Sequence, residues 1–223
     1  MGGRIILAVL AALTFSARAQ ALAITEVDAN AGLLLIGSTP PPATGGPSPI
    51  VQHIGASVPM ALPAPFFLEP SLDLFSTYYE WTGSRSVPTS YESGPGFFTI
   101  AAILAVQGGA SFPVSENVSL GGSLGLDFLL RFPFDFSSDN AQRTKGKGPS
   151  LDYFFGQGRF FYPETRFFAR WQLSNWLALV FNLRAFFPLF HLWDQEGLPF
   201  TDQFMVSAGL GFAIRLPKDF TLF

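Results

Sequence analysis

Residues 164–187 read ETRFFARWQLSNWLALVFNLRAFF, a stretch long and apolar enough to cross a membrane as a helix. Three arginines, Arg166, Arg170 and Arg184, lie inside it. An arginine at the centre of a lipid-exposed helix costs about 2.5 kcal/mol or more. A membrane-spanning helix is therefore a poor explanation of this stretch.

Alternate residues of the same stretch fall on two faces of different polarity, which is the pattern of a β-strand. One face holds only uncharged residues: Thr165, Phe167, Ala169, Trp171 and Leu173, then Leu177, Leu179, Phe181, Leu183, Ala185 and Phe187. All the charged residues lie on the opposite face. The stretch is predicted to be a β-hairpin with its turn at 174–175, one face toward lipid and the other toward a wet lumen.

The composition supports a membrane protein and excludes several other classes. Of the 223 residues only 13% are charged and 48% are hydrophobic, with 26 Phe and 22 Gly, whereas a soluble domain has about 25% charged residues. This balance argues against disorder, and a net charge of −3 without a basic motif argues against a nucleic-acid partner. No metal-ligand spacing, phosphate loop or dinucleotide fingerprint is present, so neither a cofactor nor a metal is expected.

The first 19 residues have the pattern of a secretory signal peptide. Arg4 precedes an apolar run at 5–15, and Ala17-Arg18-Ala19 is a small-x-small cleavage site. The apolar run is too short to span a membrane. We therefore expect residues 20–223 to form the exported domain, and a closed β-barrel in the cell outer membrane is the leading structure for it, because only helices and closed barrels satisfy the backbone in lipid.

Eight segments with period-two alternation can be counted along the chain. They lie at about 24–37, 49–60, 66–81, 96–112 and 117–134, in the two halves of the 164–187 hairpin, and at about 203–216. Longer polar loops at 39–47, 82–95, 137–152 and 191–202 alternate with shorter turns at 61–65, 113–116 and 174–175. This predicts an all-β fold, an eight-stranded antiparallel transmembrane β-barrel with surface-exposed loops and periplasmic termini.

Aromatic residues gather at both ends of the predicted strands. Trp171 and Trp176 flank the 174–175 turn, and the opposite strand ends hold Tyr78, Tyr79, Trp81, Phe132, Phe134 and Phe136. Such residues match the aromatic girdles of membrane barrels. The alternative is the core of a soluble β-sandwich, which would not need seven large apolar residues on one face of the 117–134 strand.

These features together resemble the small eight-stranded outer-membrane barrels, most of all the OmpW-like group; OmpA- and OmpX-like barrels fit almost as well. The resemblance rests on the signal, the length, the eight amphipathic strands, the glycine-rich LGGSLGL at 120–126 and the terminal Phe223. It implies insertion into outer-membrane lipid by the barrel-assembly machinery. One departure is that positions 215, 217, 219 and 221, two apart before Phe223, are not the apolar residues of the usual assembly signal.

Charged residues at inward positions are expected to form a network inside the lumen. They are Glu26, Asp28, Glu69, Asp73, Asp127, Arg131, Glu164, Arg166, Arg170, Arg184 and Arg215. The acids gather on the first and third strands and most arginines on the last three, so opposite charges should face one another as ion pairs. The network is either a plug that supports the barrel or a polar gate that opens.

A second inward set is apolar: Leu34, Ile36, Phe75, Tyr79, Leu129, Phe168 and Phe186. In the OmpW-like group an apolar upper lumen is thought to pass or hold small hydrophobic molecules, so the resemblance implies a ligand path at these positions. The alternative is tight packing with no cavity, because eight strands enclose a lumen just wide enough for side chains.

Three functions follow. The first is a narrow pore or conduit for small, hydrophobic solutes. The second is a non-conducting barrel whose surface loops, with Arg143, Lys145 and Lys147, bind a partner or host surface in the manner of an adhesin. The third is a lipid-modifying enzyme at the rim, for which His191 with Asp194 would be the candidate; His53 and Ser57 do not lie side by side on a strand. No nucleophile–base set is evident, so we expect no enzyme.

Overall fold

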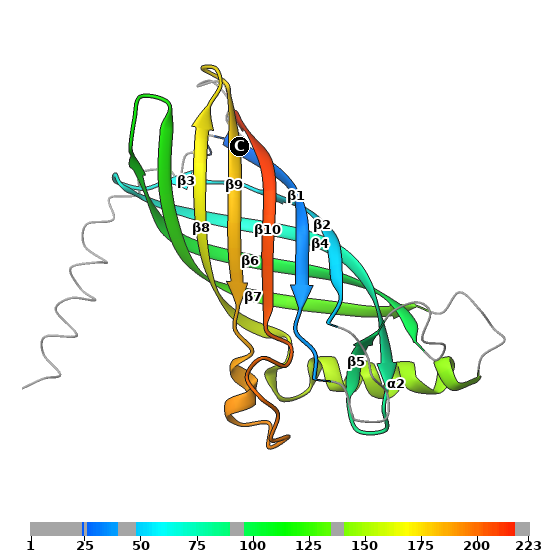
Figure 1. Cartoon of the computed structure of the whole chain (residues 1–223). Coiled ribbons are helices and arrows are strands. Elements are labelled where there is room, and N and C mark those ends of the chain that lie inside the picture. Colours follow the sequence, from blue (N-terminus) through cyan, green and yellow to red (C-terminus); the bar gives the residue numbers. More distant parts are fainter. Residues whose placement is uncertain (1–23, 25, 40–47, 90–95, 135–140, 217–223) are drawn as a thin grey trace, which may run out of the picture.

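Eight long antiparallel strands form a closed barrel in the computed structural model, which describes residues 24, 26–39, 48–89, 96–134 and 141–216 (Figure 1). The barrel strands are β1 (Glu26–Ile36), β2 (Ile50–Ser57), β4 (Phe66–Trp81), β6 (Phe97–Pro113), β7 (Val118–Phe134), β8 (Phe161–Gln172), β9 (Leu177–Phe186) and β10 (Met205–Arg215). Each was expected from the alternation of its sequence, and the predicted strand at 66–81 matches β4 residue for residue.

Two pairings close the sheet into a cylinder. The first and last strands pair antiparallel, from Glu26 opposite Arg215 to Ile36 opposite Met205. β2 pairs with β1 on one side and, over a shorter length, with β4 on the other. The prediction of an eight-stranded antiparallel barrel is therefore confirmed, including the 49–60 strand with the least regular alternation.

The two ends of the barrel differ. Short connections at 58–65, 114–117 and 173–176 lie at one end, called here the turn end, where β1 begins and β10 finishes (Figure 1). At the other end, called the loop end, β1, β4, β7 and β9 finish and β2, β6, β8 and β10 begin, with more residues between each such pair of strands. This alternation of lengths is the one predicted from the sequence.

Three of the predicted polar loops contain regular structure. The 82–95 segment includes β5 (Ser86–Thr89), which pairs with the end of β4. The segment predicted as a loop at 137–152 is largely a helix, α2 (Ala141–Phe155), followed by the 3-10 turn η2 (Gly156–Gly158). The 191–202 segment overlaps the 3-10 turn η3 (Leu189–Leu192), and β3 (Met60–Ala61) is a short addition at the turn end.

The outward strand positions form an apolar surface. Leu124 and Phe167, for example, each expose 69% of their surface, and the exposed large hydrophobic residues are spread over all eight barrel strands. Trp171 and Trp176 are exposed at the turn end, where an interfacial girdle is expected. So large an apolar exterior implies a lipid environment. Among the described residues, no helix is long and apolar enough to cross a membrane.

Some predictions fall on residues that the structure does not describe. They are the signal peptide at 1–19, most of the 39–47 loop, Phe136, the side chains of Arg143 and Lys145, and the end of the chain from Pro217 to Phe223. The way that the final residues follow β10 stays a prediction.

Candidate functional site

An arginine of β9 lies at the centre of a polar layer across the middle of the lumen. Arg184 donates to both carboxylate oxygens of Glu164, at 2.6 and 3.0 Å, and also binds Asp73. Glu164 lies on the neighbouring strand β8, whereas Asp73 lies on β4, on the far side of the barrel. The layer therefore joins opposite walls, and all three side chains are buried.

Two further ion pairs lie between this layer and the turn end. Arg166 Nη1 donates to Glu69 Oε1 at 2.6 Å, and Arg166 Nε donates to the side-chain oxygen of Asn182 at 2.8 Å. Arg170 forms a two-pronged pair with Glu26. Both arginines belong to β8, and both acids belong to strands across the lumen.

Uncharged and histidine side chains complete the polar layer, and the sequence prediction had not assigned them a role. Gln107 donates to Glu164 at 3.1 and 3.0 Å and accepts a hydrogen bond from Ser123 at 2.7 Å. His53 Nδ1 lies 3.4 Å from Asp73 Oδ1. All of these residues lie at inward positions of their strands. The predicted network included only Asp, Glu and Arg, so it did not contain them.

Four residues that were predicted to belong to the charged network form no ion pair with a described residue. Asp127 and Asp28 are buried, but neither forms an ion pair with any described residue. Arg184 lies near Asp127 but is already bonded to Glu164 and Asp73. Arg215 is exposed at the turn end and donates to the backbone oxygen of Asn175 at 3.3 Å.

The fourth, Arg131, lies deep at the loop end and forms no ion pair with an acid among the described residues. It donates to the backbone oxygen of Arg159 at 2.6 Å and to Gln203 Oε1 at 3.2 Å. Its guanidinium lies 4.4 Å from the centre of the Phe154 ring. The predicted ion-pair role is wrong, because this depth of the lumen offers aromatic rings and carbonyl groups in place of carboxylates.

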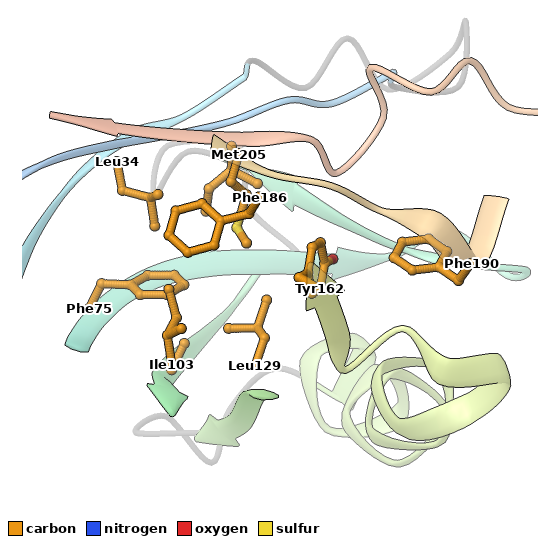
Figure 2. Packing of buried hydrophobic residues seen from close by; sticks show 10 residues of the cluster. Leu34, Phe75, Ile103, Leu129, Tyr162, Phe186, Phe190 and Met205 are labelled. Carbon is orange, nitrogen blue, oxygen red and sulfur yellow. The ribbon is translucent and has the colours of Figure 1, made fainter. Parts of the chain in front are cut away.

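Most of the predicted apolar path is a packed core. Figure 2 shows the side chains of Leu34, Phe75, Leu129 and Phe186 turned toward one another inside the barrel, between the polar layer and the loop end. None of these four exposes more than 4% of its surface. The structure therefore fills this part of the path with its own side chains.

The other two path residues lie apart from that core. Tyr79 belongs to a second cluster under α2, where its ring meets Phe154 edge-on at 4.9 Å. Phe168 lies at the turn end, beyond the polar layer, and packs edge-on against Phe67 at 5.7 Å. Ile36 belongs to the packed core as well, so the seven predicted positions do not line one continuous passage.

The loop end is covered by a cap, defined here as α2, η2, η3 and the segment at 193–204. Arg159 joins its parts, because its Nη2 atom donates to Glu196 and to Gln157, each at 2.6 Å, and its guanidinium lies 4.1 Å from the Tyr153 ring. The Tyr153 hydroxyl donates to Glu196 at 3.2 Å and accepts from Gln203 at 3.1 Å. Burial raises the pKa of Tyr153 above its ordinary value.

His191 is held by two hydrogen bonds in this cap. Its Nδ1 atom lies 2.9 Å from Asp194 Oδ2, and its Nε2 atom lies 2.8 Å from the backbone oxygen of Asp202. The side chain exposes only 3% of its surface. With both ring nitrogens engaged, His191 offers no free nitrogen to a substrate in this arrangement. The described residues also contain no cluster of three His, Cys, Asp or Glu suited to a metal ion.

Comparison with known proteins gives a fold and no family. No family model matches the chain, and no curated protein matches it. Among solved structures, Neisserial surface protein A has 9% sequence identity and a TM-score of 0.54, over 87% of this chain and 98% of that one. The Yersinia pestis attachment invasion locus protein Ail has 9% identity and a TM-score of 0.46, over 86% and 97%. The outer-membrane enzyme PagL has 13% identity and a TM-score of 0.37, over 86% and 99%.

The likeness to Neisserial surface protein A, at so low an identity, concerns the fold alone, and the finer resemblance to OmpW-like barrels stays a prediction. One barrel fold serves many functions, so function has to be argued from the lumen and the cap. The chain has the fold of the small eight-stranded outer-membrane β-barrels.

Proposed function

We propose that this chain is an outer-membrane barrel, closed to free diffusion, that presents its folded cap to a partner at the cell surface. The observation that carries the proposal is that the loop half of the lumen is filled, first by the polar layer around Arg184 and then by the apolar core around Phe186. A barrel built only to pass solutes would not need both. The loop end faces outward in this proposal, and the periplasm lies at the turn end.

Opening this lumen would be costly. Separating Arg184 from Glu164 and Asp73 would leave buried charges unpaired, and breaking one buried pair costs about 3–5 kcal/mol. A passage would also require the core below the cap to come apart. The closed state is therefore the stable one.

The cap offers exposed apolar side chains to a partner. Leu192, Trp193 and Phe200 expose 73%, 51% and 42% of their surfaces. The Trp193 indole N–H donates to the backbone oxygen of Gln157 at 2.7 Å, which holds the ring in place against η2. Exposed aromatic side chains that are already ordered are typical centres of binding energy, and the Arg159 contacts keep the underlying loops together.

Conductance and surface binding test the two halves of the proposal. In planar bilayers the protein should show no stepwise conductance, and liposomes that contain it should not take up small solutes; regular channels in the wild-type protein would contradict closure. Cells that display the protein should bind host-cell or matrix surfaces, and Leu192→Ser with Trp193→Ser should abolish the binding. Leu151→Ser, at another exposed position of the loop end, is the matched control. Equal binding by all three proteins would contradict the role of these exposed side chains.

A conduit for small hydrophobic solutes is the second candidate. It is favoured by a cavity of about 380 Å³ at the turn end, which Phe67 and Phe168 line. In this role the cap would move aside and extend that cavity through the apolar core. Channels or solute uptake that appear only when the cap is loosened, as in Arg131→Met, would support it.

We propose no catalytic role for the chain. Both nitrogens of His191 are bonded to its own loop, and His53 lies in the polar layer beside Asp73. Modification of outer-membrane lipid that is lost in His191→Ala but kept in Trp193→Ser would overturn this view.

A further inference from the structure

The turn-end cavity has the dimensions of a small-molecule site. Its volume of about 380 Å³ falls in the usual range for ligand pockets. Its lining residues come from β1, β4, β8 and other strand ends, and the polar layer closes it toward the loop end. The neighbouring space within that layer is only about 20 Å³, room for about one water. A ligand would enter from the turn end and stop at the polar layer.

One carboxylate in the wall of this cavity forms no ion pair with a described residue. Glu26 is paired with Arg170, and Glu69 is paired with Arg166. Asp28 exposes 7% of its surface, forms no ion pair with a described residue, and its Oδ1 atom is buried without a hydrogen-bond partner. A buried carboxylate in this state is costly unless a donor or cation meets it.

The opposite part of the wall is aromatic. Phe67 and Phe168 meet edge-on at 5.7 Å with an interplanar angle of 72°. Gly121 makes room for Phe168, because a Cβ atom there would lie 2.1 Å from that ring. The Arg166 guanidinium lies 5.0 Å from the centre of that ring, so this wall already accepts a cation.

From these features we infer that the turn-end cavity binds a small organic ammonium compound, whose charged nitrogen meets Asp28 and whose apolar body lies against Phe67 and Phe168. The pattern of ion pairs in the wall favours a cation over an anion. Arg166 and Arg170 each form an ion pair with another acid, whereas Asp28 forms none with a described residue. Arg215, the remaining base of the lining, is exposed at the rim, where solvent and salt screen it. This inference is independent of the proposed role of the cap.

Calorimetry on the protein in lipid nanodiscs tests the inference, with empty nanodiscs as the blank. The probes are 2-phenylethylammonium and the neutral 2-phenylethanol, which share an apolar body and differ in charge. The ammonium compound should bind saturably and at least tenfold more tightly than the alcohol. Absence of saturable binding, or equal binding of the two probes, would overturn the inference without any variant.

Substitutions then locate the site. Asp28→Asn keeps the shape of the side chain and should weaken binding of 2-phenylethylammonium at least tenfold, while heat-modifiable migration on gels confirms that the barrel is folded. Asp152→Asn, on the exposed side of α2 outside the cavity, is the control and should bind like the wild type. Phe67→Leu should weaken both probes. Unchanged affinity in Asp28→Asn would rule out the assigned site. Because conductance and surface binding are measured separately, failure here would leave the proposal for the cap standing.

Discussion

Arg184 and Asp73 lie 111 residues apart in the sequence and bind one another across the lumen. Arg184 also holds Glu164 of the adjacent strand, so one guanidinium ties together three strands. Asp73 completes the group beside His53. The Arg184 guanidinium, shared by two acids, thus holds the middle of the barrel together. Substitutions that remove it should destabilise the barrel most.

Replacing Arg184 with Met should destabilise the barrel by about 3–5 kcal/mol, because two buried carboxylates lose their counter-charge together. Urea unfolding in detergent, followed by tryptophan fluorescence, measures the loss. Arg215→Met is the matched control: that side chain is exposed at the turn end and donates to the backbone oxygen of Asn175, so its loss should cost about 1 kcal/mol or less. Equal losses for the two variants would mean that the polar layer is not the support of the barrel.

Gly55 provides the space that Asp73 needs. A Cβ atom at this position would lie 2.0 Å from Asp73 Oδ1 and 3.0 Å from the side-chain nitrogen of Asn30. Gly55→Ala should therefore push the carboxylate from its place and cost about 1–3 kcal/mol in unfolding free energy. Gly108→Ala, where a Cβ meets nothing within 4 Å, should be close to neutral. A neutral Gly55→Ala would contradict the described position of Asp73.

Phe154 should hold the cap on the barrel. It is fully buried between Tyr79 and the Arg131 guanidinium, and truncation of such a ring costs about 3–5 kcal/mol. In Phe154→Ala, amide hydrogen exchange should rise in α2 while β6 and β7 keep their protection. Its neighbour Phe155 is 38% exposed, so Phe155→Ala should leave the exchange of α2 nearly unchanged. Slow exchange of α2 in both variants would show that the cap is held by other contacts.

The cap should weaken at alkaline pH. Burial raises the pKa of Tyr153, so the folded cap keeps a proton that the unfolded segment releases near its ordinary pKa of about 10. The contribution of the protonated Tyr153 hydroxyl to the stability of the cap is therefore complete below about pH 10, and it falls as the pH rises above that value. A difference titration of phenolate absorbance, wild type minus Tyr153→Phe, should show a midpoint above 10. A midpoint at or below the ordinary value would place the hydroxyl in water.

The strands could be predicted because their two faces meet different surroundings. The sequence of each strand therefore alternates between apolar and polar residues. The alternation from Leu177 to Phe186 marks β9 almost to the residue. Parity also placed Arg166 and Arg184 inside, opposite the acids they bind. The separation of acids and arginines on different strands predicted ion pairs across the lumen, but it did not predict the individual partners.

The cap was not predictable in the same way. α2 contains Pro149 and two glycines, and its sequence has the composition of a loop; the helix is stabilised by the burial of Tyr153 and Phe154 over the barrel mouth, which is a tertiary contact. The alternation along β4 likewise predicts that Phe75 points inward. Whether such side chains fill the lumen or leave a passage depends on the packing of all eight strands. The exposed position of Arg215 has a similar cause, because parity gives the direction of a side chain and not its depth in the barrel.

The central claim is that adjacent residues of one strand meet lipid on one side and a closed interior on the other. Phe181 and Val180 of β9 test it most directly, since Phe181 is 46% exposed on the outer surface and Val180 is 3% exposed inside. Spin labels placed on cysteines at the two positions, in bilayers, should differ sharply: the label at 181 should collide with dissolved oxygen and be shielded from a water-soluble nickel chelate, and the label at 180 should be shielded from oxygen. Ready access of the chelate to position 181, or equal oxygen access at both positions, would contradict the account.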